Sequence, residues 1–152
     1  MHRIPLLCTA ALVAACADQA TVAPVTPDVA FLKSPGTEDM NLPFSAAVRA
    51  GDFLFLSGAI GIEPESGELA PGGIQPETQQ TLENIRASVE RFGTSMDRVV
   101  KCTVFLADMA EWGAMNEVYR TFFTNPPARS ALGTSGLALG ARVEIECIAM
   151  MP

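Results

Sequence analysis

Histidine is almost absent from this chain of 152 residues, and its scarcity narrows the available chemistry. The one histidine, His2, precedes the segment in which we expect a folded domain. A domain without histidine excludes a Ser-His-Asp triad, a Cys-His pair and histidine metal ligands. The remaining candidates for acid-base chemistry are the carboxylates, Lys33, Lys101, Tyr119 and the thiols of Cys102 and Cys147.

Basic residues are also scarce. The chain has 10 Lys and Arg against 17 Asp and Glu, a formal net charge of -7. Binding to phosphates relies on clustered Lys and Arg, so we expect no nucleic acid partner. The length and the 49% of hydrophobic residues fit one globular domain with a substantial core.

The first residues are typical of a secretion signal. A cationic start is followed by an apolar run from Ile4 to Ala15, too short to span a membrane, and then by a cysteine. The tetrapeptide Val13-Ala14-Ala15-Cys16 resembles the lipobox of bacterial lipoproteins, in which the cysteine is acylated. We therefore predict a lipoprotein-type signal peptide over 1–15, with an ordinary signal peptide cleaved near Ala17 as the alternative.

Residues 16–41 are then predicted to be the lipidated Cys16 and a flexible tether. Pro24, Pro27 and Pro35 are interspersed with small residues, and no helical or strand period is sustained. These features predict an exported protein of the bacterial periplasm or envelope, in contact with the membrane only through its lipid anchor.

The two later cysteines, Cys102 and Cys147, have no C-x-x-C spacing and read as small buried strand residues. In an oxidising compartment they could form a disulfide if the fold places them side by side. The sequence leaves open whether they are free.

Over 42–152 the order of elements predicts an α+β domain. Short strands are expected at 45–49 and 53–56, followed by a Gly- and Pro-rich loop and a helix over 76–92. A strand at 98–106, a helix at 111–123 and strands at 128–134 and 142–150 complete it. This order predicts a mixed β-sheet with both helices on one face.

Side chains of the last predicted strand, 142–150, should point alternately to the two faces of the sheet. Val143, Ile145, Cys147 and Ala149 should face the helices, which leaves Glu144, Glu146, Ile148 and Met150 on a bare face. With Phe53 and Phe55 this face would be a large apolar patch for a monomer, so we expect it to be buried against another subunit.

Arg129 and Glu144 lie on consecutive predicted strands. A hairpin turning near residues 136–138 would place their side chains opposite each other, about 5 Å apart. The pair is then either a structural ion pair at an interface or a site for a small carboxylate, held bidentately by the guanidinium.

Several segments resemble the RidA (YjgF/YER057c/UK114) family of imine and enamine deaminases. They include 54-LFLSGAIG-61, 78-TQQTLENIRASVERFG-93, 98-RVVKCTVFLADM-109, 127-PARSA-131 and 143-VEIECIAM-150. Their order and spacing cover essentially all of residues 42–151, so the resemblance spans the whole expected domain.

The resemblance implies a chorismate-mutase-like fold and a homotrimer with interfacial clefts. It also implies hydrolysis of small reactive 2-imino or 2-enamino acids to 2-oxo acids and ammonia, with no metal and no organic cofactor. By position, Arg129 would bind the substrate carboxylate and Glu144 would activate water. The other implied cleft residues are Ser57, Gly58, Ala131 through its backbone, Asn116 and Tyr119.

Three departures from the family pattern bear on activity. Phe44 lies in the cleft region where a tyrosine is common, Ala59 replaces a glutamine, and Ala131 replaces a frequent cysteine. The alternatives to an enzyme are therefore a non-catalytic module that binds small carboxylates and a holdase-like interaction protein. Glu146 is either an interface or solvated carboxylate, or a second catalytic group.

Overall fold

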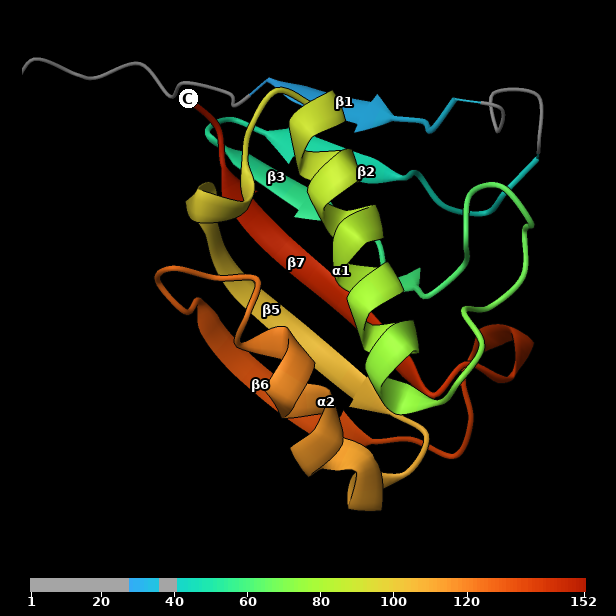
Figure 1. Ribbon diagram of the computed structural model, residues 1–152. Helices are drawn as coiled ribbons and strands as arrows, with labels where there is room; N and C mark the ends of the chain where they lie inside the picture. The colour runs from blue at the N-terminus through green and yellow to red at the C-terminus, as the bar shows by residue number, and fades with distance from the viewer. Residues whose placement is uncertain (1–27, 36–40) are drawn as a thin grey trace, which may run out of the picture.

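The structure is a computed structural model that describes residues 28–35 and 41–152. The predicted signal peptide and Cys16 lie outside the described residues. The domain is a mixed sheet with helices α1 (Ile74–Arg91) and α2 (Trp112–Tyr119) packed on one face (Figure 1). The strands are β1 (Val29–Leu32), β2 (Ala47–Ala50), β3 (Phe53–Leu56), β4 (Ala59–Ile60), β5 (Val99–Leu106), β6 (Ala128–Gly133) and β7 (Val143–Met150). This arrangement confirms the predicted α+β fold class.

The strand order is β1-β2-β3-β7-β5-β6, and the short β4 continues the line of β3 along β7. Strands β5 and β6 are parallel and joined through α2, whereas the other pairs are antiparallel. The last strand in sequence therefore lies in the middle of the sheet, as Figure 1 shows.

The core fills the space between the sheet and the helices. Leu82, Ile85 and Val89 of α1 are buried at the helical spacing expected from the sequence. Val143 and Ile145 of β7 are fully buried beneath them. On the opposite face Phe53 and Phe55 remain about two-fifths exposed, at 42% and 43%. The predicted division of the sheet into a covered and a bare face is confirmed.

Two short strands were not expected. The sequence predicts a flexible tether over Val29–Leu32, but this segment forms β1 and pairs antiparallel with β2, because its extended backbone bonds to the open edge of that strand. The sequence predicts a loop at Ala59–Ile60, which instead form β4 and pair with β7. The helices begin and end within a few residues of the expected positions, and the second is shorter than expected. Within the described residues, neither helix is both long and apolar enough to cross a membrane.

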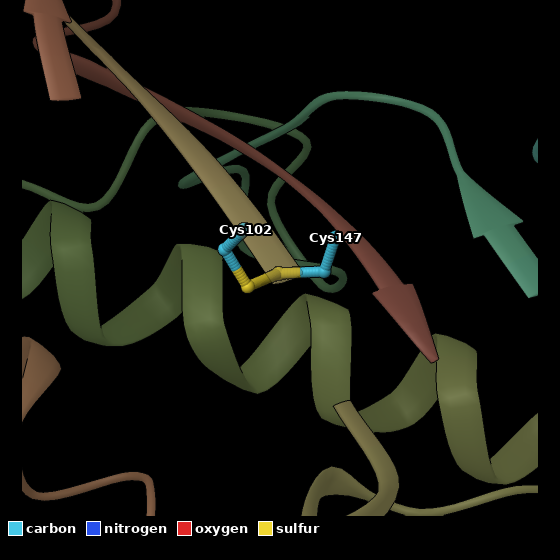
Figure 2. Close-up of a disulfide and its surroundings, with 2 residues drawn as sticks. All are labelled: Cys102 and Cys147. Carbon is cyan, nitrogen blue, oxygen red and sulfur yellow. A yellow bond between two sulfur atoms is a disulfide. The ribbon is translucent and has the colours of Figure 1, made fainter. Parts of the chain in front are cut away.

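Cys102 and Cys147 form a disulfide between β5 and β7, on the side of the sheet that faces α1 (Figure 2). They are directly opposed in the antiparallel register, with Cα atoms 4.1 Å apart. Both residues are buried, at 0% and 2% exposure. The bond therefore links the two central strands of the sheet covalently inside the core.

We expect the disulfide to stabilise the domain by about 2–4 kcal/mol, because it closes a long loop in the unfolded chain. Its two cysteines are 45 residues apart in sequence. Reduced wild type and a Cys102→Ala/Cys147→Ala variant should both unfold at lower urea concentration than oxidised wild type. Equal midpoints for oxidised and reduced wild type would contradict this role.

Candidate functional site

Arg129 lies on the edge strand β6 and faces the helix layer. It is paired with Cys102, whose side chain is in the core on the helix side. Its guanidinium carbon lies 4.6 Å from the ring centre of Tyr119 and 6.0 Å from that of Trp112. Cation–π contacts of this kind hold a guanidinium without using its N–H donors.

No carboxylate neutralises Arg129 within the described part of the chain. The ion pairs there are Arg86–Glu83 and Arg142–Glu111, and Arg129 donates no hydrogen bond to a described atom. A planar group with five free donors is matched to a carboxylate or phosphate oxygen pair. Arg129 is therefore placed to receive an anion from outside the chain.

A cavity of about 370 Å³ opens beside Arg129. Its other lining residues come from α2 and the segment that leads to β6, and they are Asn116, Tyr119, Arg120, Phe123, Pro126 and Pro127. The lining contains two arginines, one amide and no carboxylate. This volume falls in the range of small-ligand sites.

Tyr119 forms part of the cavity wall and is only 5% exposed. Its hydroxyl has no hydrogen-bond partner. Burial raises the pKa of Tyr119 to about 12, and the nearby positive charge of Arg129 partly offsets that rise. The side chain is therefore neutral near pH 7, and its hydroxyl is a buried polar atom without a hydrogen-bond partner.

Glu144 lies on β7 and faces the bare side of the sheet. It pairs with Phe105 of β5 on one side and with Ile60 of β4 on the other. Its carboxylate lies against the backbone of Gly58, so closely that a Cβ at residue 58 would be 1.9 Å from Oε1. A glycine at this position is what leaves room for the carboxylate.

An irregularity between β3 and β4 creates this close approach. Phe55 pairs with Ile148 and Ala59 pairs with Ile145, so three residues, 56–58, oppose two on β7. Such bulges are frequent next to functional sites because they redirect the chain. The Ser57 hydroxyl donates to the Ser45 carbonyl at 2.6 Å and so fixes the bulge to the chain entering β2.

The expected hairpin between Arg129 and Glu144 is wrong. The connection through α2 makes β5 and β6 parallel, and β6 pairs with the edge of β5 instead of with β7, so β5 lies between the two strands. Arg129 is paired with Cys102 and Glu144 with Phe105, and the two side chains point to opposite faces. Within one chain they neither form an ion pair nor share a cavity.

Six of the predicted site residues form two separate groups, which we name the arginine half-site and the glutamate half-site. The arginine half-site consists of Arg129, Asn116 and Tyr119. The glutamate half-site consists of Glu144, Gly58 and Ser57.

Phe44 is 60% exposed and shares a second hollow, of about 520 Å³, with Ser57. Ala131 lies on β6 two residues beyond Arg129 and packs against the core. Glu146 is exposed on the bare face, two residues after Glu144 on β7.

Sequence reasoning missed Arg120. The signal was available, because Arg120 follows Asn116 by four residues, a spacing that places two side chains on one face of a helix. Among the described residues, no group of three or more His, Cys, Asp or Glu side chains is arranged to hold a metal ion.

Comparison with known sequences identifies the family of the chain. Residues 37–151 match the model of the family described as Endoribonuclease L-PSP. A RutC family protein of Pyrococcus horikoshii is 46% identical over 108 residues, which are 70% of this chain and 86% of that protein. The mouse protein named 2-iminobutanoate/2-iminopropanoate deaminase is 43% identical over 109 residues, 71% of this chain and 81% of the relative.

Solved structures agree with the fold. A yeast protein superposes with a TM-score of 0.75 at 32% identity, covering 82% of this chain and all (100%) of its own. TdcF of E. coli with bound serine superposes with a TM-score of 0.68 at 31% identity, covering 80% and 94%. The chain belongs to the Endoribonuclease L-PSP family, which is the RidA (YjgF) family that its motifs resemble.

Proposed function

We propose that this protein hydrolyses small 2-imino or 2-enamino acids to 2-oxo acids and ammonia. The observation that carries the proposal is the uncompensated Arg129 guanidinium, held by aromatic rings beside an open cavity. The mouse, rat and human relatives named 2-iminobutanoate/2-iminopropanoate deaminase support the same reaction class.

In this proposal Arg129 binds the substrate carboxylate through two N–H donors, which orients the C=N carbon toward the attacking water. Asn116 and Tyr119 complete the same wall of the cavity. The ring of Tyr119 also holds the Arg129 guanidinium, whose carbon lies 4.6 Å from the ring centre.

Glu144 acts as the base. Water adds to the C=N carbon and gives a proton to the carboxylate, and the carboxylate then passes a proton to nitrogen. The carbon–nitrogen bond breaks as the C=O bond forms, so imine and water yield 2-oxo acid and ammonia. Among the described residues no histidine is present to take this role.

The opposite orientation of Arg129 and Glu144 leads to a second part of the proposal, that each active site lies between two copies of the chain. We propose a homotrimer in which the arginine half-site of one copy meets the glutamate half-site of the next. The exposed Phe53 and Phe55 of the bare face support subunit contact there, since an isolated monomer would leave them in water.

The main alternative is a binding module that holds a small carboxylate without hydrolysis. Phe44 favours it, because a phenyl ring offers no hydroxyl to ligand or water, and Ala59 removes an amide. The TdcF structure contains serine, a small amino acid. Retention of Glu144 against Gly58 favours the enzyme, since binding alone does not require a second carboxylate near the substrate.

Cleavage of RNA, which the family description suggests, is disfavoured by charge. The chain carries a net charge of -7, and RNA binding depends on clusters of basic residues.

We also propose that the protein is exported and anchored through a lipid at Cys16. The buried Cys102–Cys147 disulfide supports this location, because disulfides persist in oxidising compartments. A Cys16→Ser variant should move from the membrane fraction to the soluble fraction. Identical fractionation of wild type and variant would contradict the anchor.

Substitutions at Glu144 and Gly58 test whether Glu144 acts as the base in hydrolysis. Glu144→Gln keeps the shape and should lower the hydrolytic rate by about a hundredfold or more, with 2-oxobutanoate binding preserved. Gly58→Ala should lower the rate as well, because its Cβ displaces the Glu144 carboxylate while the fold persists. Ammonia release from 2-iminobutanoate generated in situ measures both.

The matched control is Glu146→Gln, which removes the next carboxylate on the same face of β7. It should hydrolyse the imine at the wild-type rate. If Glu144→Gln is as active as wild type, the binding module becomes the better description.

Mixed oligomers test whether the site lies between copies. Arg129→Ala and Glu144→Gln chains should each be inactive alone, whereas heterotrimers of the two chains should recover activity at about one site in three. The hetero-oligomer is isolated through two different affinity tags, and its mass is measured by light scattering. Purified hetero-oligomers without activity, or a monomer mass for wild type, would refute the interfacial site.

A further inference from the structure

The lining of the cavity beside Arg129 includes a second arginine that the proposed reaction does not use. Arg120 caps the C-terminal end of α2 and lines the same cavity. Its Nε donates to the carbonyl of Asn116 at 3.2 Å, which holds the side chain back along the helix. Its terminal Nη groups have no carboxylate within ion-pairing distance in the described part of the chain.

Two arginines without an ion-pair partner line one small cavity, in a chain that has 17 acidic and 10 basic residues. The cavity lining nevertheless contains no Asp or Glu. Two like charges with no counter-charge repel each other, and an anion with two negative groups relieves that repulsion. The two arginines do not serve to attract anions to the protein in general, because the net charge of -7 repels anions at long range.

We propose that the cavity selects dicarboxylic substrates, namely 2-imino acids that carry a second carboxylate at the end of the side chain. The proposal rests on the function proposed above. Arg129 binds the carboxylate next to the imine carbon, and Arg120 binds the distal carboxylate. The volume of about 370 Å³ is larger than a three- or four-carbon acid requires and accommodates a five-carbon diacid.

The competing possibility is a preference for an apolar side chain, since Phe123, Pro126 and Pro127 also line the cavity. The two possibilities differ in their dependence on Arg120. A distal carboxylate needs the guanidinium, whereas a branched alkyl group gains only from the apolar wall.

The experiment measures binding of product analogues to the full-length protein by calorimetry. The probes are 2-oxoglutarate, a dianion, and 4-methyl-2-oxopentanoate, a monoanion of similar size with an apolar end. Wild type should bind 2-oxoglutarate about fivefold more tightly or better, on the scale of one partly exposed ion pair. Raising the salt concentration should reduce this preference.

Substitutions test whether Arg120 causes the preference for 2-oxoglutarate. Arg120→Gln should bind both probes equally, with the affinity for 4-methyl-2-oxopentanoate unchanged. The Arg129→Ala variant should bind neither probe. The control Arg91→Gln removes an exposed arginine at the end of α1, outside the cavity, and should keep the wild-type preference.

Each failure has a distinct signature. If both probes bind through Arg129 but wild type prefers the monoanion, or if Arg120→Gln keeps the preference for the dianion, the dicarboxylate inference is overturned and the proposed function stands. If neither probe binds, or if Arg129→Ala does not weaken binding, the proposed function fails and this inference fails with it.

Discussion

The pairing of β5 with β7 is the interaction on which the rest of the domain depends. Strands β3 and β4 pair with the other edge of β7, and β6 pairs with the other edge of β5. A slip of one residue between the central strands would turn Glu144 toward the helices and move Arg129 relative to it. The Cys102–Cys147 disulfide prevents that slip, because it joins the two strands at one fixed register position.

Much of the fold follows from local patterns in the sequence. The spacing of Leu82, Ile85 and Val89 predicts α1 and its buried face, and the alternation from Val143 to Met150 predicts which side of β7 is covered. Strand β1 carries no comparable signal. It has four residues, none of them fully buried, and it pairs through its backbone with the edge of β2 while Leu32 packs against the core.

The candidate site was less predictable because its geometry depends on contacts distant in sequence. Arg129 and Glu144 lie on strands that are consecutive in the chain, which suggests a hairpin. The helix between β5 and β6 makes those two strands parallel, and β5 lies between β6 and β7 in the sheet. The crossover rule fixes the direction of β6 but not its neighbour, because β3 and β5 are also joined through a helix and still have β7 between them. The sequence also does not reveal that the Glu144 carboxylate lies on the backbone of Gly58, because that contact depends on the bulge at residues 56–58.

The opposed directions of Arg129 and Glu144 also constrain how copies could meet. A contact that brings Arg129 of one copy to Glu144 of another joins two different faces of the sheet, so it is heterologous. Heterologous contacts close into rings or continue as filaments, whereas a two-fold dimer repeats one patch on both partners. In a closed ring every arginine half-site finds a glutamate half-site, and no exposed Phe53 or Phe55 face is left at an open end. Burial of those rings and completion of the site would then be consequences of the same contact.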